Sequence, residues 1–517
     1  MRTILSASAL ALATLGFAQS PVAPTRAAAP HQAIADLGMG LRVVATDELD
    51  LGQRCAAIRD GTGNPMLVWA YADGGALTVA KDRVAIERWL TAHAAALGQT
   101  GFVPAFARNA SWRGCDGWTF EFSRDGAPLF DSDVTLYFDG DRCVGLFNRM
   151  PRASSVDPTV RAGDGTSIWY GRRDGSGAIV RARLVQSLTP THHVTEVVDA
   201  GAVVHRMFEQ REWTAAPQQA AMTEYTFPGM SFPDQIWADS KGLIWFSEPT
   251  PSRISVFDPN TAQFRSYPTT GYSSPDGFVV DDQDRAWFGL YASGHGLGKI
   301  DIPTGVFTRY APPYSPASMA IPTPSGYGTL YVTDHANEKV SEFDPRTNTW
   351  VRTISLPAST YPVGIHLESE TNTAWSPLYF FQGLGKLPPG APTMQRIAAP
   401  SQNGPAFGGV NDGKVYFTYW TANKLGVYDT KTNTFAEYLW RAGENGGPMF
   451  MAPNGHAVIG TRSRGYIAIF DPVTRTFTDY LIPTTSPGLK DGLTVAPDGV
   501  IWFTQSSANK IAKLVLP

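Results

Sequence analysis

The chain has 517 residues, which is too long for one ordinary domain. Its 50 glycines, 39 prolines and 12% aromatic residues favour many short strands joined by tight turns, and they argue against a long helical solenoid. The formal net charge is -4 and no run of basic residues occurs, so there is no electrostatic reason to expect nucleic acid as a partner.

The first 18 residues predict a signal peptide. Arg2 precedes an apolar run that ends at Phe17, and the small side chain of Ala18 stands before a cleavage point at Gln19. At about fourteen residues the apolar run is short for a membrane span, and no later segment qualifies. We therefore expect a secreted or periplasmic protein with no membrane span.

Residues 30–210 predict an α+β domain. Residues 80–97 have the clearest amphipathic helical pattern of the chain, with Val84 and Ile86 on its apolar face. Residues 117–147 then form three apolar segments separated by turns. Such a pattern is typical of a three-stranded meander.

Three cysteines lie in the first 150 residues, and export permits disulfides. In a meander the first and third strands start at the same end of the sheet. Cys115 and Cys143 are therefore the expected pair, and Cys55 is left over. A bridge that closes a loop of this size would stabilise the fold by roughly 3 kcal/mol.

The hairpin formed by residues 126–134 and 138–141 resembles that of PepSY and thermolysin-type propeptide domains, and residues 194–201 are similar to their closing strand. The resemblance implies a domain that assists folding or inhibits a neighbouring protein. No His-Glu-x-x-His protease motif follows. Residues 209–221, rich in proline, glutamine and alanine, predict the linker to the second domain, 221–517.

A repeat organises residues 221–517. Large apolar side chains recur at intervals of 42, 44, 44, 41, 42 and 44 residues, by subtraction of successive positions, and they are Trp245, Trp287, Tyr331, Trp375, Tyr416, Val458 and Trp502. Each interval holds four short apolar segments and tight turns such as Asp258-Pro259, which is the size of one propeller blade. The repeat predicts a seven-bladed β-propeller, so the expected fold class is mainly β with an N-terminal α+β domain.

The ends of the repeat predict how the propeller closes. After Trp502 only a third strand, over residues 510–514, has room to form. Residues 223–228 match the outer strands of the other blades. We therefore expect the last blade to take its fourth strand from the start of the domain, which removes free sheet edges.

Acidic residues gather in one predicted sector of the channel. Asp491, Asp234 and Asp276 stand at the starts of innermost strands in the last, first and second blades, and Glu248 ends a second strand. Four carboxylates together repel one another unless they are neutralised, so they predict a site for a divalent cation, Mg²⁺ or Ca²⁺. The alternative is that each aspartate bonds the backbone of a neighbouring blade or caps a turn.

Basic and aromatic residues lie across the predicted channel, on loops of the later blades. They are Arg441, Arg462, Arg464, Lys490, Tyr419, Trp420 and Trp440, and we expect a ligand to contact Tyr419, Trp420, Arg462, Arg464 and Lys490. Such a rim suits an anionic, partly apolar small molecule or glycan, such as a uronate sugar or a cyclic peptide. The alternative is a solvated rim of loop charges.

Two histidines, His295 and His335, lie on predicted upper loops of adjacent blades. Histidine is the commonest general base, so both are candidates for a catalytic role. The alternative is that they are loop residues without a catalytic function.

The repeat itself resembles that of the virginiamycin B lyase, or streptogramin lyase, family. Residues 498–504 read Asp-Gly-Val-Ile-Trp-Phe-Thr and are followed by Asn509-Lys510-Ile511, similar to the family pattern D-G-x-x-W-F-T-E…N-x-I. The resemblance implies a propeller that opens a cyclic depsipeptide by magnesium-assisted elimination.

This chain departs from the family at the residues that carry its chemistry. Asp491 stands in the place of the family's histidine, and Leu489 and Gln505 stand in the places of its acids. The family's site is therefore not transferred to these residues. Two functions remain open: a secreted lyase or lactonase-like hydrolase that uses the acidic sector, and a non-catalytic propeller that binds a glycan or peptide.

Overall fold

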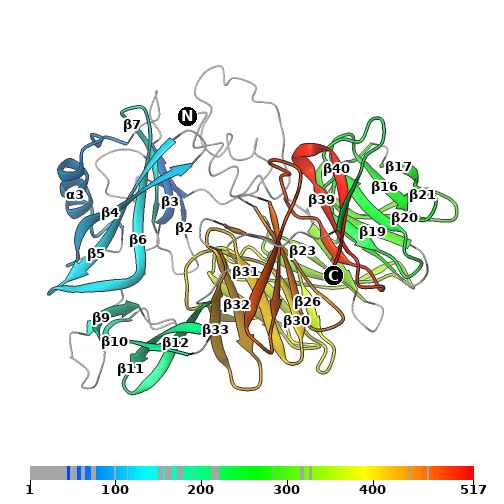
Figure 1. Ribbon diagram of the computed structural model, residues 1–517. Coiled ribbons are helices and arrows are strands. Elements are labelled where there is room, and N and C mark those ends of the chain that lie inside the picture. The colour runs from blue at the N-terminus through cyan, green and yellow to red at the C-terminus, as the bar shows by residue number, and fades with distance from the viewer. Residues whose placement is uncertain are drawn as a thin grey trace.

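The computed structural model describes most of residues 44–210, in segments, and nearly all of residues 221–516 (Figure 1). The predicted signal peptide and residues 211–220 of the linker lie outside the described residues. Strands dominate, and α3 (Arg83–Ala92) is the α-helix of the described part. No helix there is both long and apolar enough to cross a membrane.

The strands of the N-terminal part precede the repeat. Their bounds are β1 (Val44–Thr46), β2 (Cys55–Arg59), β3 (Pro65–Ala70), β4 (Val103–Trp112), β5 (Cys115–Arg124), β6 (Ala127–Asp139), β7 (Arg142–Asn148), β8 (Ser155–Asp157), β9 (Thr166–Gly171), β10 (Ala178–Leu188), β11 (His192–Asp199) and β12 (Ala202–Gln210).

Helix α3 is shorter than the helix predicted over residues 80–97. Asp82 caps its start, since the side chain accepts a hydrogen bond of 2.9 Å from the backbone N–H of Ala85. Ile86 and Leu90, one turn apart, are fully buried. Val84 is 59% exposed, so its placement on the apolar face was wrong.

The predicted meander is confirmed as β5, β6 and β7, which pair antiparallel in that order. The disulfide expected from it is not found: the structure records no bridge at Cys143, the cysteine whose side chain is described. The starts of β5 and β7 do share one end of the sheet, but β6 lies between them. Two strand spacings amount to about 10 Å, whereas the Cα atoms of a disulfide lie within about 7 Å.

The repeat forms four-stranded antiparallel sheets. Their strands are β14 (Ile236–Ala238), β15 (Ile244–Glu248), β16 (Arg253–Asp258), β17 (Gln263–Pro268); β18 (Ser273–Val280), β19 (Arg285–Ser293), β20 (Gly296–Asp301), β21 (Val306–Tyr310); β22 (Ala320–Pro324), β23 (Leu330–Asp334), β24 (Lys339–Asp344), β25 (Thr349–Ser355); β26 (His366–Glu368), β27 (Thr373–Leu378), β28 (Gly383–Leu387), β29 (Gln395–Ala398); β34 (Gly446–Met451), β35 (Ala457–Thr461), β36 (Tyr466–Asp471), β37 (Thr476–Leu481); and β13 (Ala221–Tyr225) with β38 (Leu493–Val495), β39 (Ile501–Gln505), β40 (Lys510–Val515).

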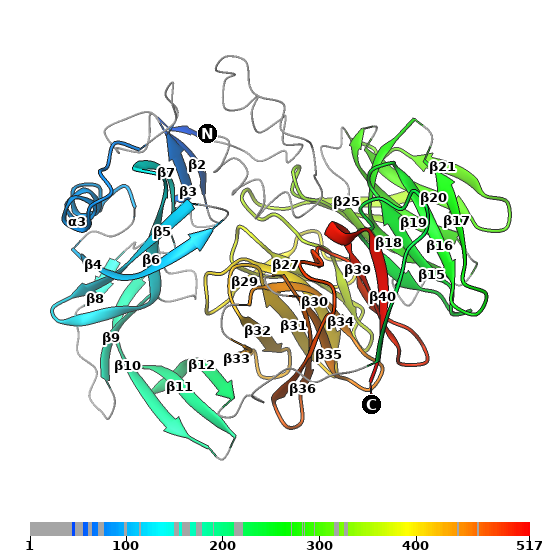
Figure 2. The same cartoon turned by 45° about the horizontal axis from the view of Figure 1, so that its top comes forward.

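These six separate sheets are the blades of a β-propeller, and Figure 2 shows the C-terminal part of the chain that they form, beside the N-terminal strands. The predicted closure is confirmed, because β13 pairs antiparallel with β40 in register from Ala221 opposite Val515 to Tyr225 opposite Ile511. Strands β30 (Pro405–Asn411), β31 (Lys414–Tyr419), β32 (Lys424–Asp429) and β33 (Thr434–Leu439) also pair in order, but they belong to a larger sheet that continues into the N-terminal part.

The repeating large residues form the cores of these sheets. Each lies on the second strand of its four, and Trp245, Trp287 and Trp375 are fully buried. Their indole N–H groups still need acceptors. Trp245 donates to Asp239 and Trp287 to Asp281, at 2.9 and 2.8 Å, so in these two blades an acidic residue six positions earlier accepts from the repeating tryptophan.

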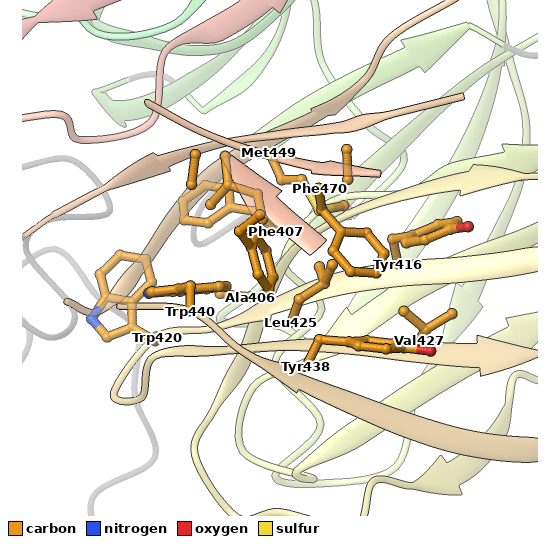
Figure 3. Close-up of a cluster of buried hydrophobic side chains, with 14 of the residues drawn as sticks. Ala406, Phe407, Tyr416, Trp420, Leu425, Val427, Tyr438, Trp440, Met449 and Phe470 are labelled. Atoms are coloured by element: carbon orange, nitrogen blue, oxygen red, sulfur yellow. The ribbon is translucent and has the colours of Figure 1, made fainter. Parts of the chain in front are cut away.

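The largest buried cluster, shown in part in Figure 3, lies around β30–β36, with Trp420 and Trp440 at one end and Tyr416 at the other. It includes Phe208 of β12, whose ring stacks on that of Tyr438 at 4.9 Å. Side chains of the N-terminal part therefore contribute to an apolar cluster of the propeller.

Strand β12 pairs parallel with β33, from Met207 opposite Glu437 to Glu209 opposite Leu439, and both ribbon views place the two strands side by side (Figure 1). A buried polar group forms there, called here the junction cluster. It consists of His205, Ser401, Tyr419, Lys424 and Glu437. The Glu437 carboxylate accepts from His205 Nε2 at 2.8 Å and from the Tyr419 hydroxyl at 2.7 Å.

Candidate functional site at the channel mouth

The three aspartates predicted to face one sector do come together. Asp276 lies in β18, and Asp234 and Asp491 lie two residues before β14 and β38. These innermost strands neighbour one another, with β14 between β38 and β18. The side chains are no more than 5% exposed. We call Asp234, Asp276, Asp491 and the two cations described next the mouth cluster.

Lys490 supplies the first cation. Its Nζ donates to Asp234 Oδ2 at 2.7 Å and lies 3.6 Å from Asp491 Oδ2. Burial disfavours the ammonium, but Asp234, Asp491 and Asp276 outweigh it and raise the pKa of Lys490. The lysine therefore stays charged although it is 4% exposed.

Arg462 supplies the second cation. Its Nη1 lies 3.6 Å from Asp491 Oδ1 and donates to the backbone carbonyl of Lys490 at 3.0 Å. The guanidinium carbon lies 3.8 Å from the centre of the Trp420 ring, a stacked cation–π contact. Burial lowers the pKa of Arg462 to about 10, so the group is still positive at neutral pH.

The mouth cluster holds three carboxyl groups and two cations, so full ionisation would leave an uncompensated buried charge. Burial and the nearby Asp234 raise the pKa of Asp276 to about 7. Burial also raises the pKa of Asp491 well above its usual range, although Lys490 opposes the shift. Asp276 accepts from the backbone N–H of Gly277 at 2.8 Å and from Gln235 Nε2 at 3.4 Å.

An aromatic arc continues from Arg462 around the rest of the mouth. Trp420 stacks on Phe407 at 5.7 Å and meets the edge of Tyr379 at 6.3 Å. Tyr379 contacts Tyr361, which in turn stacks on His335 at 4.9 Å. One side of the mouth is thus charged and the other aromatic.

His335 is buried within this arc. Its Nδ1 lies 2.5 Å from the backbone carbonyl of Pro362, which can only accept, so Nδ1 carries the proton and Nε2 is left as the basic nitrogen of a neutral ring. Burial lowers the pKa of His335, although the carbonyl of Pro362 and the charge of Asp334 oppose the shift. His295 is partly exposed, and its carbonyl accepts from Arg309 Nη2.

Two predicted site residues lie elsewhere. The Glu248 carboxylate is held by Arg253, with Nε at 2.7 Å, and by the Ser255 hydroxyl, so it does not join the aspartates as predicted. Tyr419 is fully buried in the junction cluster and does not lie on the rim. Both corrections have one physical reason: the side chain at a strand end bonds a polar partner on another strand of the same sheet.

The remaining rim residues have varied positions. Arg441 forms a two-pronged ion pair with Asp479, its Nε lying 2.6 Å from Oδ2, and Trp440 is buried beside it. Arg464 lies outside the described residues. The cations of the rim whose contacts are described are therefore already paired with carboxylates.

The residues predicted to bind a divalent cation do not suit one in their described arrangement. No group of three or more His, Cys, Asp or Glu side chains in the described part is placed to hold a metal ion. Lys490 stands among the aspartates instead. A cation ligand sphere needs several oxygens free to face the ion.

Sequence reasoning missed the aromatic half of the mouth. Tyr361 and Phe407 flank the starts of innermost strands, next to Pro362 and Pro405, where the aspartates of other blades were recognised. Comparing the starts of the innermost strands between blades also brings out these two aromatic residues. Trp420 was predicted on the rim, but the sequence does not distinguish Tyr361 and Phe407 from ordinary core residues, because aromatic residues are common in strands.

The solved structures that resemble the propeller include three lyase structures. Virginiamycin B lyase from Staphylococcus aureus is 19% identical, covers 58% of this chain and 100% of its own, and has a TM-score of 0.53. A streptogramin B lyase is 21% identical, with 57% and 98% covered and the same TM-score. A catalytically inactive variant of the Staphylococcus aureus enzyme with quinupristin is 18% identical, with 58% and 100% covered and a TM-score of 0.53.

No protein-family profile matches the sequence, and no curated protein matches it. At these identities the likeness shows the fold alone. The C-terminal part of the chain is a β-propeller whose fold is similar to that of these lyases.

Proposed function

We propose that the propeller acts on a small molecule at the channel mouth and opens a cyclic ester by elimination. The observation that carries the proposal is the pKa of Asp276, raised to about 7 by burial and by Asp234 at the mouth of a streptogramin-lyase-type propeller. A carboxyl group with such a pKa can accept and return a proton near neutral pH. Perturbed groups of this kind cluster at functional sites.

In this reaction the Asp276 carboxylate removes a proton from the carbon next to the one that bears the ester oxygen. The electron pair of that C–H bond forms a C=C bond, and the C–O bond breaks to release a carboxylate. No water and no redox partner are consumed. Lys490 and Arg462 stabilise the negative charge that develops on the leaving oxygen.

His335 and His295 are the competing candidates for the base. His335 is favoured over His295 by its fixed ring, since the bond from Nδ1 to the Pro362 carbonyl leaves Nε2 as the proton acceptor. Variants of Asp276, His335 and His295 tested side by side assign the role.

The substrate class follows from the charges of the mouth. The two cations of the mouth cluster are already matched by three carboxyl groups, so a further anion gains little. The aromatic arc from Trp420 to Tyr361 is buried, and it makes this side of the mouth apolar. A neutral cyclic ester with aromatic or apolar groups therefore suits the mouth better than a uronate glycan does.

A non-catalytic binding propeller is the second candidate. The charged groups of the mouth cluster are buried and contact one another. A purely structural network of ion pairs also shifts pKa values, so this arrangement favours the second candidate. A peptide or glycan would then contact the mouth without reaction.

Incubation of the full chain with quinupristin and with simple lactones, followed by mass spectrometry, tests the proposal. Elimination gives a ring-opened product of unchanged mass, whereas a lactonase adds one water. We expect the unchanged mass, and loss of the product in Asp276→Asn. Binding of these compounds without formation of any product would favour the second candidate, a non-catalytic binding propeller.

We further propose that β30–β33 count as the seventh blade, since β30 neighbours β26 on one side and β34 on the other. Residues 30–210 are proposed as a PepSY-like α+β domain, and residues 1–18 as a signal peptide of a secreted or periplasmic protein. Amino-terminal sequencing of the protein recovered from the extracellular or periplasmic fraction tests the last point, with Gln19 as the expected first residue.

A further inference from the structure

The mouth cluster has one ammonium where the sequence predicted a metal ion. Lys490 Nζ lies 2.7 Å from Asp234 and 3.6 Å from Asp491, and the charge of Asp276 also acts on it. We infer that the ε-ammonium of Lys490 takes the place of a divalent cation at the channel mouth, so that these three aspartates need no bound metal.

The charges of the cluster favour a lysine over an added metal ion. Three ionised aspartates carry three negative charges, and Lys490 with Arg462 carries two positive ones. One proton on the aspartates makes the cluster neutral. A divalent cation added to Lys490 and Arg462 would leave a net positive charge in a buried site, which is costly.

The contacts of Lys490 also fit an ammonium. A distance of 2.7 Å to a carboxylate oxygen is that of a charge-assisted N–H hydrogen bond. The Nζ atom lies 5.2 Å from the centre of the Phe232 ring, which provides a cation–π contact on another side.

Lys490 joins the sheets where the propeller closes. Its side chain reaches from the last blade, before β38, to Asp234 of the first blade, and its backbone carbonyl is held by Arg462 of β35's loop. The blades approach so closely here that a Cβ on Gly492 would lie 2.0 Å from the carbonyl of Asp234. A metal ion would bridge the same blades, and the lysine does so as part of the chain.

The inference concerns the site of the proposed function but does not depend on the proposed reaction, because its readout is cation binding and stability. In the first experiment, the full-length wild-type protein is titrated with Ca²⁺ and with Mg²⁺ in a calorimeter, and its Tm is measured with chelator and with each ion. We expect no stoichiometric binding and no change in Tm.

In the second experiment the lysine is removed. At pH 8, Lys490→Ala leaves three carboxylates with Arg462 as their only cation, so Tm should fall. Added Ca²⁺ or Mg²⁺ should raise the Tm of this variant by several degrees, and chelator should reverse the increase. The matched control is Lys513→Ala on β40 of the same blade, whose Nζ faces the Trp502 ring at 5.9 Å. Its Tm should not respond to either ion.

Each outcome decides the inference. Stoichiometric binding of either ion by the wild type, with a Tm that drops in chelator, would overturn it. A folded Lys490→Ala variant that ignores both ions would show that the aspartates do not form a cation site, and would also overturn it. If the variant fails to fold, the wild-type titration alone tests the inference. A loss of ring-opening activity does not bear on this inference.

Discussion

The mouth cluster and the junction cluster are both buried groups of ionisable side chains, yet their balance of charge differs. At the junction, one carboxylate, Glu437, is surrounded by Lys424, His205 and two hydroxyl donors. At the mouth, three carboxyl groups share two cations. The mouth cluster lies within the propeller, and the junction cluster lies where β12 pairs with β33.

The pKa values of the carboxyl groups move in opposite directions. Burial raises the pKa of Glu437, but Lys424 and His205 outweigh it and hold that pKa well below the usual range. Burial together with Asp234 raises the pKa of Asp276 to about 7. Burial alone therefore does not decide protonation; the number of donors and cations around each carboxyl does. A carboxyl group with enough donors and cations around it stabilises the fold as a carboxylate, whereas one with too few can take up and release a proton near neutral pH.

The largest effect is expected at the junction. Glu437→Gln removes the buried carboxylate that lies 3.6 Å from Lys424 Nζ and accepts hydrogen bonds from His205 and Tyr419. Loss of one partner of a buried ion pair costs about 3–5 kcal/mol. The free energy of unfolding in urea should fall by that amount.

Glu209→Gln is the matched control for this variant. Glu209 lies on β12 opposite Leu439, two residues along β33 from Glu437, but it is exposed. Its replacement should change the unfolding free energy by less than about 0.5 kcal/mol. Equal effects of the two substitutions would contradict the account of the junction.

The next effect is a dependence of stability on pH at the mouth. An aspartate in the unfolded chain loses its proton near pH 3.8, whereas Asp276 in the folded protein holds it to about 7. The unfolded state therefore binds fewer protons between these values, so the stability of the folded state falls as pH rises from about 4 to about 7 and then levels off. In Asp276→Asn this decline should be shallower, as measured by urea unfolding across the range.

Glu437 acts with the opposite sign. Its lowered pKa contributes stability that is present above pH 4.5, its ordinary value, and is lost as pH falls below it. The two windows are separate, so one titration series distinguishes them. Asp498→Asn, in an exposed turn, is the control and should leave the decline between pH 4 and 7 intact.

The smallest effect is expected for an ion pair at the surface of the N-terminal part. Arg206 Nε donates to Glu196 at 2.6 Å, but the two side chains are 44% and 24% exposed. Water screens such a pair, so Arg206→Gln should lower the unfolding free energy by about 0–1 kcal/mol. A loss as large as that of Glu437→Gln would remove the distinction between buried and exposed charges on which the comparison rests.

The repeat and the closure of the propeller could be predicted because they depend on spacing. The interval from Trp245 to Trp287 and the match of residues 223–228 to outer strands are both visible along the chain. The gathering of Asp491, Asp234 and Asp276 followed from blade order in the same way. Where the backbone repeats at a fixed period, the place of a residue in the fold can be predicted from the sequence without knowledge of its side-chain contacts.

The partners of each side chain could not be predicted. Glu248 and Tyr419 occupy comparable strand ends, but Arg253 holds the first and Glu437 of the outer strand holds the second. The role of Lys490 depends on a rotamer that points at Asp234 and not at solvent. The pairing of β12 with β33 joins residues more than 200 positions apart and has no periodic signal.

The claim that carboxyl groups outnumber cations at the mouth is tested most directly by infrared difference spectroscopy of the protonated carboxyl stretch. In the wild-type protein, a band from a buried protonated carboxyl should be lost as pH rises through about 7, and this component should be missing from Asp276→Asn. A wild-type spectrum with no such titration, or one that is unchanged in the variant, would contradict the account.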